Sequence, residues 1–417
     1  MRTDDLILVS IDDHVVEPPD MFDRHVPKKW ADLAPRLVRD DQGVDRWMYR
    51  GVQAGVAGLN AVVSWPPEEW GIDPAGYAEM RPAVYDVNER VADMNRNGIL
   101  ASMCFPTFAG FSAGHLSRVR DEVTVVMIQA YNDWHIDEWA AAHPGRFIPI
   151  ALLPLWDPAL AVAEIRRVAA KGCRSVTMPE QPHLDGLPSY HDLDHWGPVF
   201  EALSASGTVM CLHIGQGFGA ITQAPDAPID NKMILACQVS ALGAQDLLWG
   251  PALRTYPDLR VAWSEGGIGW IPFYLDRCDR HYTNQRWLRR DFGDRLPSDV
   301  FREHSLACYV TDPTSLKLRH DIGIDIIAWE CDYPHSDSFW PDAPERVLGE
   351  LESAGATDAE INKITWENAV RFFDWDPFTH IPRERANVGA LRSLAADVDV
   401  SERSRKEWAA LYAARSA

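Results

Sequence analysis

The chain has 417 residues, 46% of them hydrophobic, and its 17 Trp residues allow a large buried core. The formal net charge of −21 at pH 7 argues against a nucleic acid or an anionic membrane as partner, because either would repel the protein. The seven Cys are dispersed and form no Cys-x-x-Cys, so neither a thiolate zinc site nor a disulfide framework is indicated. No apolar run of about 18 residues occurs and no secretory pattern follows Met1, so we expect a cytoplasmic protein.

Eight short apolar runs, separated in several places by amphipathic patterns, predict strands that alternate with helices. The helical patterns include Ala159–Ala170 and His195–Ser204. Eight strands with intervening helices favour a closed (β/α)8 TIM barrel, and a doubly wound open sheet is the alternative. The predicted strands are Leu6–Ile11, Ile99–Cys104, Phe147–Leu152, Ser175–Met178, Thr208–Ile214, Leu259–Ser264, Ala307–Thr311 and Ile324–Ala328.

Two segments depart from this alternation. The stretch between the first two predicted strands is too long for a plain βα connection, and it predicts a lid or insertion within residues 15–95. The end of the chain, residues 378–417, predicts a helical arm that we expect to pack on a neighbouring or partner subunit rather than on the core. We therefore expect a single barrel over residues 1–377 followed by this arm.

Metal-binding residue types stand where the predicted strands end. Asp12 and His14 follow the first strand, and because alternate residues of a strand share a face, they point the same way while Asp13 points the other way. Active sites of such barrels gather at the carboxyl ends of the strands, and carboxylates with imidazoles bind divalent metals. The candidate ligands are Asp12, His14, Glu180, His213, Glu265 and Asp332.

Four short segments together resemble a known family. They are Ile11-Asp12-Asp13-His14, His213-Ile214-Gly215, Ser264-Glu265-Gly266-Gly267 and Asp332-Tyr333-Pro334-His335. The chain from Leu6 to about Trp375 resembles the amidohydrolase superfamily, in its amidohydrolase-2 branch related to aminocarboxymuconate semialdehyde decarboxylase. The resemblance implies a distorted (β/α)8 barrel of the metal-dependent hydrolase type, with ligands on strands one, four, five, six and eight.

The resemblance also implies residue roles. Asp12 and His14 stand where the family has a His-x-His pair, His213 matches the strand-five histidine, and Asp332 matches the strand-eight aspartate that binds metal or handles a proton. His335 is the candidate proton handler, with a third histidine ligand or a group that orients Asp332 as alternatives.

Two further carboxylates complete the set implied by the resemblance. Glu180 lies near the strand-four bridging ligand, although it could be an ordinary loop residue. Glu265 replaces a histidine of many relatives, although it could simply be an acid at the start of the next helix. Four carboxylates with two imidazoles favour a hard-metal centre with two divalent ions per chain, iron first, with manganese or zinc as alternatives.

This donor set favours a non-haem di-iron or Mn/Fe monooxygenase, and so does the segment Asp-Asp-His-Val-Val-Glu-Pro-Pro at residues 12–19, which resembles oxygen-activating members of the family. Its substrates would be dioxygen and a small organic acid or secondary metabolite. The alternative is a zinc- or manganese-dependent hydrolase or a non-oxidative decarboxylase. We expect a homo-oligomer or pairing with a paralogous subunit. A third hypothesis is that this chain is itself a non-catalytic partner subunit that retains the barrel for assembly. Candidates for an aromatic pocket wall are Trp65, Trp70, Phe105, Phe108, Phe111 and Trp340.

Overall fold

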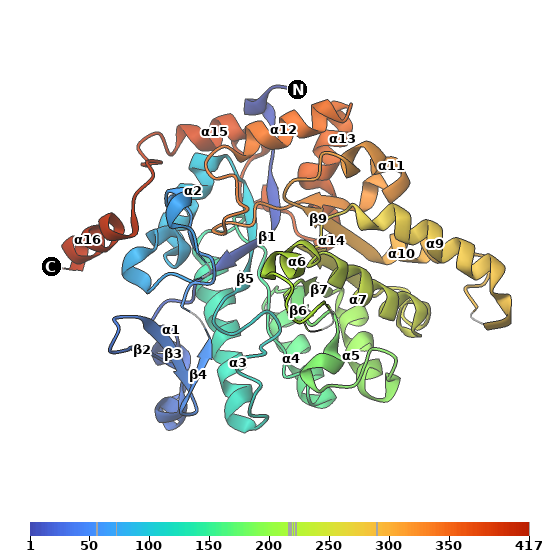
Figure 1. The fold of residues 1–417 in the computed structure, drawn as a ribbon, viewed down its shortest axis with the longest axis horizontal. Coiled ribbons are helices and arrows are strands. Elements are labelled where there is room, and N and C mark those ends of the chain that lie inside the picture. Colours follow the sequence, from blue (N-terminus) through green and yellow to red (C-terminus); the bar gives the residue numbers. More distant parts are fainter. Residues whose placement is uncertain are drawn as a thin grey trace. The chain divides into compact units, whose positions relative to one another are not determined.

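The computed structural model describes residues 1–55, 57–71, 73–215, 219, 221, 223–288 and 291–416 (Figure 1). The chain forms two compact units. Unit 1 comprises Met1–Leu152, Glu330–Leu348 and Asp376–Ala417, and unit 2 comprises Leu153–Trp329 and Gly349–Trp375. No helix within these described ranges combines the length and the hydropathy needed to cross a membrane.

Unit 1 is built on a parallel pair of strands, β1 (Val9–Val15) and β5 (Ala101–Pro106), both fully buried. Helix α2 (Val87–Asn97) leads into β5, and the side chain of Asp86 caps its first backbone N–H groups. The helix ends at Gly98, whose φ of 71° closes the last turn in the left-handed conformation that glycine adopts without strain. Helix α3 (Glu122–Trp134) follows β5.

The predicted insertion between β1 and α2 contains a small antiparallel sheet that the sequence did not suggest. After α1 (Met21–His25) its strands are β2 (Arg36–Arg39), β3 (Asp45–Tyr49) and β4 (Val52–Gly55), in the order β2-β3-β4. Trp47 of this sheet stacks on Phe108, which follows β5, with ring centroids 4.5 Å apart. The insertion therefore packs against the segment at the carboxyl end of β5.

Unit 2 holds a five-stranded parallel sheet in the order β10-β9-β8-β7-β6. Its strands are β6 (Ser175–Met178), β7 (Val209–His213), β8 (Arg260–Ser264), β9 (Ser305–Tyr309) and β10 (Ile327–Trp329). The strands are almost entirely buried, which is typical of parallel sheets covered on both faces. The helices of unit 2 are α4 (Pro158–Ala170), α5 (Leu193–Ser206), α6 (Ile229–Ile234), α7 (Gln238–Trp249), α8 (Ala252–Thr255), α9 (Trp270–Asn284), α10 (Pro297–His304), α11 (Arg319–Ile322), α13 (Asp358–Asn362) and α14 (Asn368–Phe373).

Several predicted boundaries need correction. Phe147–Leu152 is not a strand, since it makes isolated bridges instead of a continuous ladder, one from Phe147 to Ser102 and one at Ala151. The last strand begins at Ile327, because the preceding Ile324–Ile326 forms a 3-10 turn. The first strand extends to Val15, with an irregularity between Ser10 and Asp13, so the candidate ligands lie within β1 rather than beyond it.

The C-terminal arm makes contacts with the insertion of unit 1. Helix α12 (Ala343–Ser353) is followed in unit 1 by α15 (Val388–Ser393) and α16 (Arg405–Ser416). Arg405 forms an ion pair with Glu79 of the insertion at 2.6 Å, and Trp408 is buried with Val62 and Trp65. The sequence did not suggest these contacts within unit 1, because the apolar side chain of Trp408 is hidden among charged neighbours. Packing of the arm on another subunit stays a prediction.

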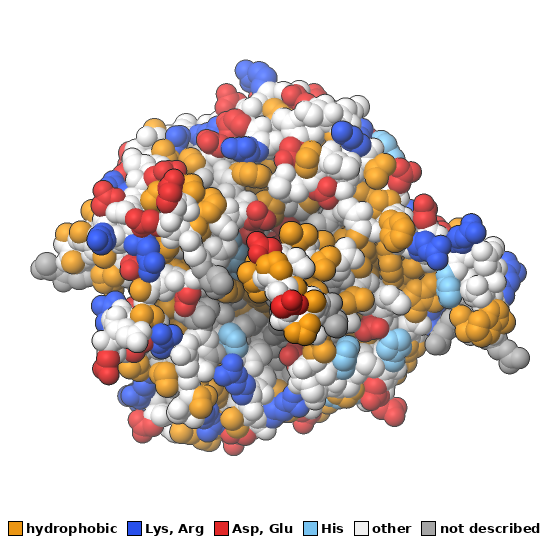
Figure 2. All heavy atoms as spheres, viewed as in Figure 1, with side chains coloured by type: hydrophobic (Ala, Val, Ile, Leu, Met, Phe, Trp, Pro, Cys, Tyr) orange, Lys and Arg blue, Asp and Glu red, His pale blue; other side chains and the backbone are white. Residues whose placement is uncertain are grey.

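One apolar surface of unit 2 is exposed. Helix α6 leaves Ile229, Met233 and Ile234 between 60% and 74% exposed. Hydrophobic side chains gather over this helix in the space-filling view (Figure 2). Nothing in the described part of unit 2 covers these three side chains.

Candidate metal centre

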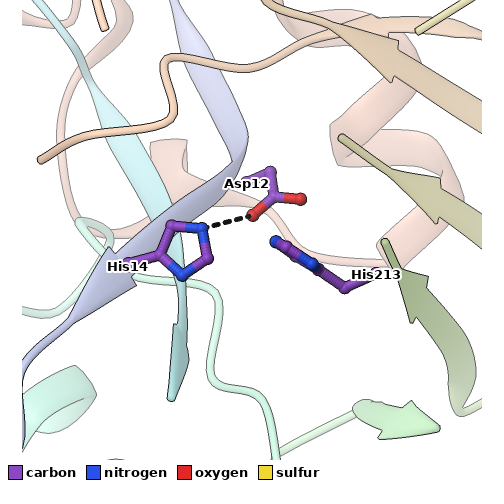
Figure 3. Close-up of side chains that lie close together, drawn as sticks. All are labelled: Asp12, His14 and His213. Atoms are coloured by element: carbon purple, nitrogen blue, oxygen red, sulfur yellow. Dashed lines mark ion pairs between the residues drawn. The ribbon is translucent and has the colours of Figure 1, made fainter. Parts of the chain in front are cut away.

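The first group of candidate ligands lies in unit 1, where the segment after Trp329 runs beside β1. Asp332 N donates to the Asp12 carbonyl at 3.0 Å, and His14 N donates to the Tyr333 carbonyl at 2.7 Å. These bonds bring Asp332 next to the two ligands that β1 supplies. Figure 3 shows Asp12 and His14 side by side on β1, and His213 at the end of β7.

Four side chains of this group lie close together and almost out of solvent. His14 Nε2 lies 3.3 Å from Asp332 Oδ1 and 3.8 Å from Asp12 Oδ1. His335 Nδ1 lies 2.8 Å from the same Asp332 Oδ1. His14, Asp332 and His335 each offer a ligand atom within 4.8 Å of the others. The structure thus brings Asp12, His14, Asp332 and His335 together, and their role as metal ligands or proton handler stays a prediction.

The spacing of these atoms fits a divalent ion. Metal bonds to nitrogen and oxygen of about 2.0–2.2 Å place neighbouring ligands roughly 3.0–3.6 Å apart. The distance of 3.3 Å from His14 Nε2 to Asp332 Oδ1 falls in this range. Asp12 and Asp332 are buried, and two buried carboxylates are costly unless a cation balances their charge. The donors therefore suit a metal site better than a set of uncompensated acids.

Asp13 points away from this group, as the alternation of β1 predicts, and its carboxylate accepts hydrogen bonds from three segments of unit 1. Its Oδ1 accepts hydrogen bonds of 3.0 Å from Ser10 Oγ and from Tyr333 N, and its Oδ2 accepts one from Ser102 Oγ. Burial raises the pKa of Asp13 to about 6. Asp13 therefore ties β1, β5 and the segment that carries Asp332 to one another.

The second group lies in unit 2. His213 ends β7, and Glu265 follows β8 directly with a φ of 56°. His213 Nδ1 lies 2.5 Å from the Ile214 carbonyl, which can only accept, so Nδ1 carries the proton and Nε2 presents a lone pair. Nε2 lies 3.0 Å from Glu265 Oε2, the separation of two neighbouring ligands of one ion or of two groups that share a proton. Glu265 is thus a partner of His213 and not only an acid at a helix start.

Glu180 is the third predicted residue of unit 2, and the structure rejects the alternative of an exposed loop residue. Its side chain is fully buried. A Cβ built on Gly243 of α7 would lie 3.0 Å from the Glu180 carbonyl oxygen, so the helix passes directly over it. Its role as a bridging ligand stays a prediction.

Sequence reasoning missed the residues that support the group in unit 1. Arg90 of α2 donates to the His14 carbonyl, and its guanidinium lies 4.3 Å from the ring centroid of Tyr333. Tyr333 in turn donates to Asp93, also on α2, at 2.7 Å. The signal available in the sequence was an Arg and an Asp three positions apart on a helix, which alone is too common to indicate a site.

The comparison with families of known proteins decides the classification. The Amidohydro_2 family model, described as amidohydrolase, matches residues 63–375. The chain belongs to the amidohydrolase family. This confirms the predicted superfamily and its amidohydrolase-2 branch.

Among curated relatives, a gamma-resorcylate decarboxylase of Polaromonas sp. is 23% identical over 73% of this chain and 95% of its own length. A 2-amino-3-carboxymuconate-6-semialdehyde decarboxylase of Dictyostelium discoideum is 22% identical over 73% of this chain and 81% of its own length. Both relatives are decarboxylases by name.

Solved structures agree on the fold. An amidohydrolase from Mycobacterium avium subsp. paratuberculosis gives a TM-score of 0.69 at 21% identity, over 88% of this chain and 97% of its own. A dihydroxybenzoic acid decarboxylase from Polaromonas sp., with bound manganese and the inhibitor 2-nitroresorcinol, gives a TM-score of 0.60 at 19% identity. The match covers 90% of this chain and 98% of its own. The predicted distorted (β/α)8 barrel is confirmed at the level of fold, and the open-sheet alternative falls.

The functional prediction needs correction. The matched relatives are decarboxylases, so the predicted di-iron or Mn/Fe monooxygenase, with dioxygen as a substrate, was wrong. The error came from counting carboxylates, because a carboxylate-rich donor set suits several hard metals and does not by itself imply oxygen activation. A divalent metal is supported, but a preference for iron is not.

Proposed function

We propose that the protein is a metal-dependent, non-oxidative decarboxylase of an aromatic or similarly conjugated carboxylic acid. The observation that carries this proposal is the buried grouping of His14, Asp332 and His335, in which a metal-ligand pair and a proton-bearing imidazole share one carboxylate. The decarboxylase relatives, one of which the chain covers over 95% of its length, support the same reaction class.

Asp12, His14 and Asp332 would hold the ion, and manganese is our first choice because a neighbouring structure carries it and the donors are rich in oxygen. When bound, such an ion neutralises the carboxylate of the substrate and fixes its orientation. The rings of Phe111 and Phe105, 5.5 and 6.3 Å from the His14 ring, would supply an apolar wall against which an aromatic acid can lie.

In this reaction the bond between the ring carbon and the carboxylate carbon breaks, and CO2 leaves without the bonding electrons. The pair left on the ring carbon takes up a proton, so no oxidant or reductant is consumed. His335, whose Nδ1 lies 2.8 Å from Asp332 Oδ1, would hold that proton and deliver it through or beside this carboxylate.

His213 and Glu265 supply a second set of donors in our proposal. The distance of 3.0 Å from His213 Nε2 to Glu265 Oε2 suits two ligands of one divalent ion, in line with the expected two ions per chain. Metal analysis by mass spectrometry tests this point. We expect Glu265→Gln to retain one ion fewer per chain than the wild type, and equal metal content would contradict the second ion.

The test of the reaction uses the full chain loaded with Mn²⁺ and a panel of hydroxybenzoic acids in D₂O without oxygen. We expect one CO2 per product and one deuterium at the vacated ring carbon. Amide and ester derivatives of the same acids are assayed alongside. Turnover that requires oxygen, or hydrolysis of these derivatives with no CO2 released from any of the acids, would overturn the proposal. A homo-oligomeric assembly stays a prediction that sedimentation analysis can test.

A further inference from the structure

Helix α2 presents two charged residues to the segments that carry the candidate ligands of unit 1. Arg90 and Asp93 stand three positions apart and therefore share one face of the helix. Both side chains are buried. Because buried charges are kept only where they have specific partners, their contacts identify what this helix does.

Arg90 contacts both ligand-bearing segments at once. Its Nη2 donates to the carbonyl of His14 on β1, and its Nε donates to the Ala83 carbonyl at 2.9 Å. The same guanidinium lies 4.3 Å from the ring centroid of Tyr333, the residue after Asp332. A single side chain thus fixes the strand that carries His14 and the segment that carries Asp332.

Tyr333 is held from its other end by a second charged pair. Its hydroxyl donates to Asp93 Oδ2 at 2.7 Å. Arg81 Nε and Nη2 donate to the two oxygens of Asp93 at 2.6 and 2.7 Å, a bidentate geometry that leaves Asp93 little freedom. The Tyr333 ring is therefore fixed by a cation on its face and by an anion at its hydroxyl.

We propose that Arg90 and Tyr333 are positioning residues of the metal centre. They keep Asp332 Oδ1 within 3.3 Å of His14 Nε2, a separation that suits two ligands of one ion, and they do so through backbone and ring contacts. The inference rests on the proposed function only in requiring that this group binds a divalent ion. Residues that orient metal ligands change affinity by about 10- to 100-fold when lost.

The test measures the dissociation constant of Mn²⁺ by titration, with free Mn²⁺ followed by its electron paramagnetic resonance signal. We expect Arg90→Met to raise the constant by about tenfold or more, and Tyr333→Phe, which keeps the ring and loses only the hydroxyl, to raise it severalfold. Arg90→Lys, which retains the positive charge, should recover part of the loss. Excess Mn²⁺ should restore turnover in all three variants.

Arg146→Met is the matched control. Arg146 is also buried and also donates to two backbone carbonyls, those of Ile99 and Leu100 at 3.0 and 2.6 Å, but it does so before β5 begins. Its loss should lower the midpoint of thermal unfolding and leave the Mn²⁺ constant unchanged.

Two results would overturn the inference, and they are distinguishable. Wild-type Mn²⁺ affinity in folded Tyr333→Phe and Arg90→Met would reject the positioning role and leave the proposed function intact. Absence of Mn²⁺ binding by the wild-type protein would reject both. Because Tyr333→Phe removes a single oxygen atom, it keeps the test decisive even if Arg90→Met fails to fold.

Discussion

The imidazoles of His14 and His335 stack with ring centroids 3.9 Å apart, and both direct a nitrogen at the same oxygen of Asp332. This one oxygen is not expected to accept hydrogen bonds from both rings and to bind a metal ion as well. The shorter contact, 2.8 Å from His335 Nδ1, suits a hydrogen bond, and the longer one, 3.3 Å from His14 Nε2, suits two ligands around an ion. The two histidines therefore have different roles on either side of one carboxylate.

The first prediction concerns metal binding by His14. His14→Ala should weaken Mn²⁺ binding by more than about 100-fold, since even the loss of an outer contact can cost that much. Treatment with a chelator should abolish wild-type turnover, and added Mn²⁺ should restore it. Exposed His320, which pairs with Glu360 at 3.0 Å, gives the control His320→Ala. Equal Mn²⁺ affinity in the two variants would contradict the assignment of His14.

The second prediction separates the two possible tasks of His335. In His335→Asn the amide nitrogen replaces Nδ1 and can still donate to Asp332, but it cannot act as an acid. We expect kcat to fall by about 10²- to 10⁴-fold in His335→Asn, with Mn²⁺ affinity little changed. In His335→Ala both properties should be lost. If His335→Asn keeps the wild-type kcat, His335 only orients Asp332.

The third prediction concerns stability in acid. His135 is buried at the end of α3 with Nε2 3.1 Å from the Cys104 carbonyl, and burial lowers its pKa from 6.5 to about 4. Between these values the unfolded chain binds the extra proton, so this stabilising contribution is complete above pH 6.5 and disappears as the pH falls towards 4. The difference between the two pKa values corresponds to roughly 3 kcal/mol in the free energy of unfolding.

His135→Gln places an amide nitrogen near the position of Nε2 and does not titrate. Thermal unfolding at pH 7 and pH 5 should therefore show a larger fall in midpoint for the wild type than for this variant. Parallel pH profiles of the two proteins would contradict the assignment.

The fourth prediction tests the close approach of α7 to Glu180. In Gly243→Ala the new methyl group would lie 3.0 Å from a backbone oxygen and 3.2 Å from Cβ of Glu180, so α7 or the segment of Glu180 must move slightly to relieve a tight contact. We expect a destabilisation of about 1–3 kcal/mol. The control Gly349→Ala adds a methyl group in α12 where nothing lies within 4 Å, and it should stabilise by up to about 1 kcal/mol. Equal thermal midpoints in the two variants would contradict this packing.

The sequence predicted the strands well because each is a short apolar run bounded by polar residues. Ser175–Met178 was predicted to the residue, and the pairing of Asp12 with His14 follows from alternation along β1. The prediction of a strand at Phe147–Leu152 was wrong because an apolar run can be buried without forming a continuous strand ladder. The functional prediction was wrong because the set of metal ligands does not determine the reaction. The reaction also depends on the other groups that the protein places beside the metal.

By itself the sequence determined the alternation of strands and helices, the family and which side chains stand at strand ends, since these depend on spacing along the chain. Only the tertiary structure decided that Tyr333 N donates to Asp13, 320 positions away. It also decided that Arg90 contacts both the His14 carbonyl on β1 and the ring of Tyr333. The physical reason is that backbone hydrogen bonds and ring contacts between distant segments depend on how those segments pack. Such packing leaves no periodic trace in the order of residues.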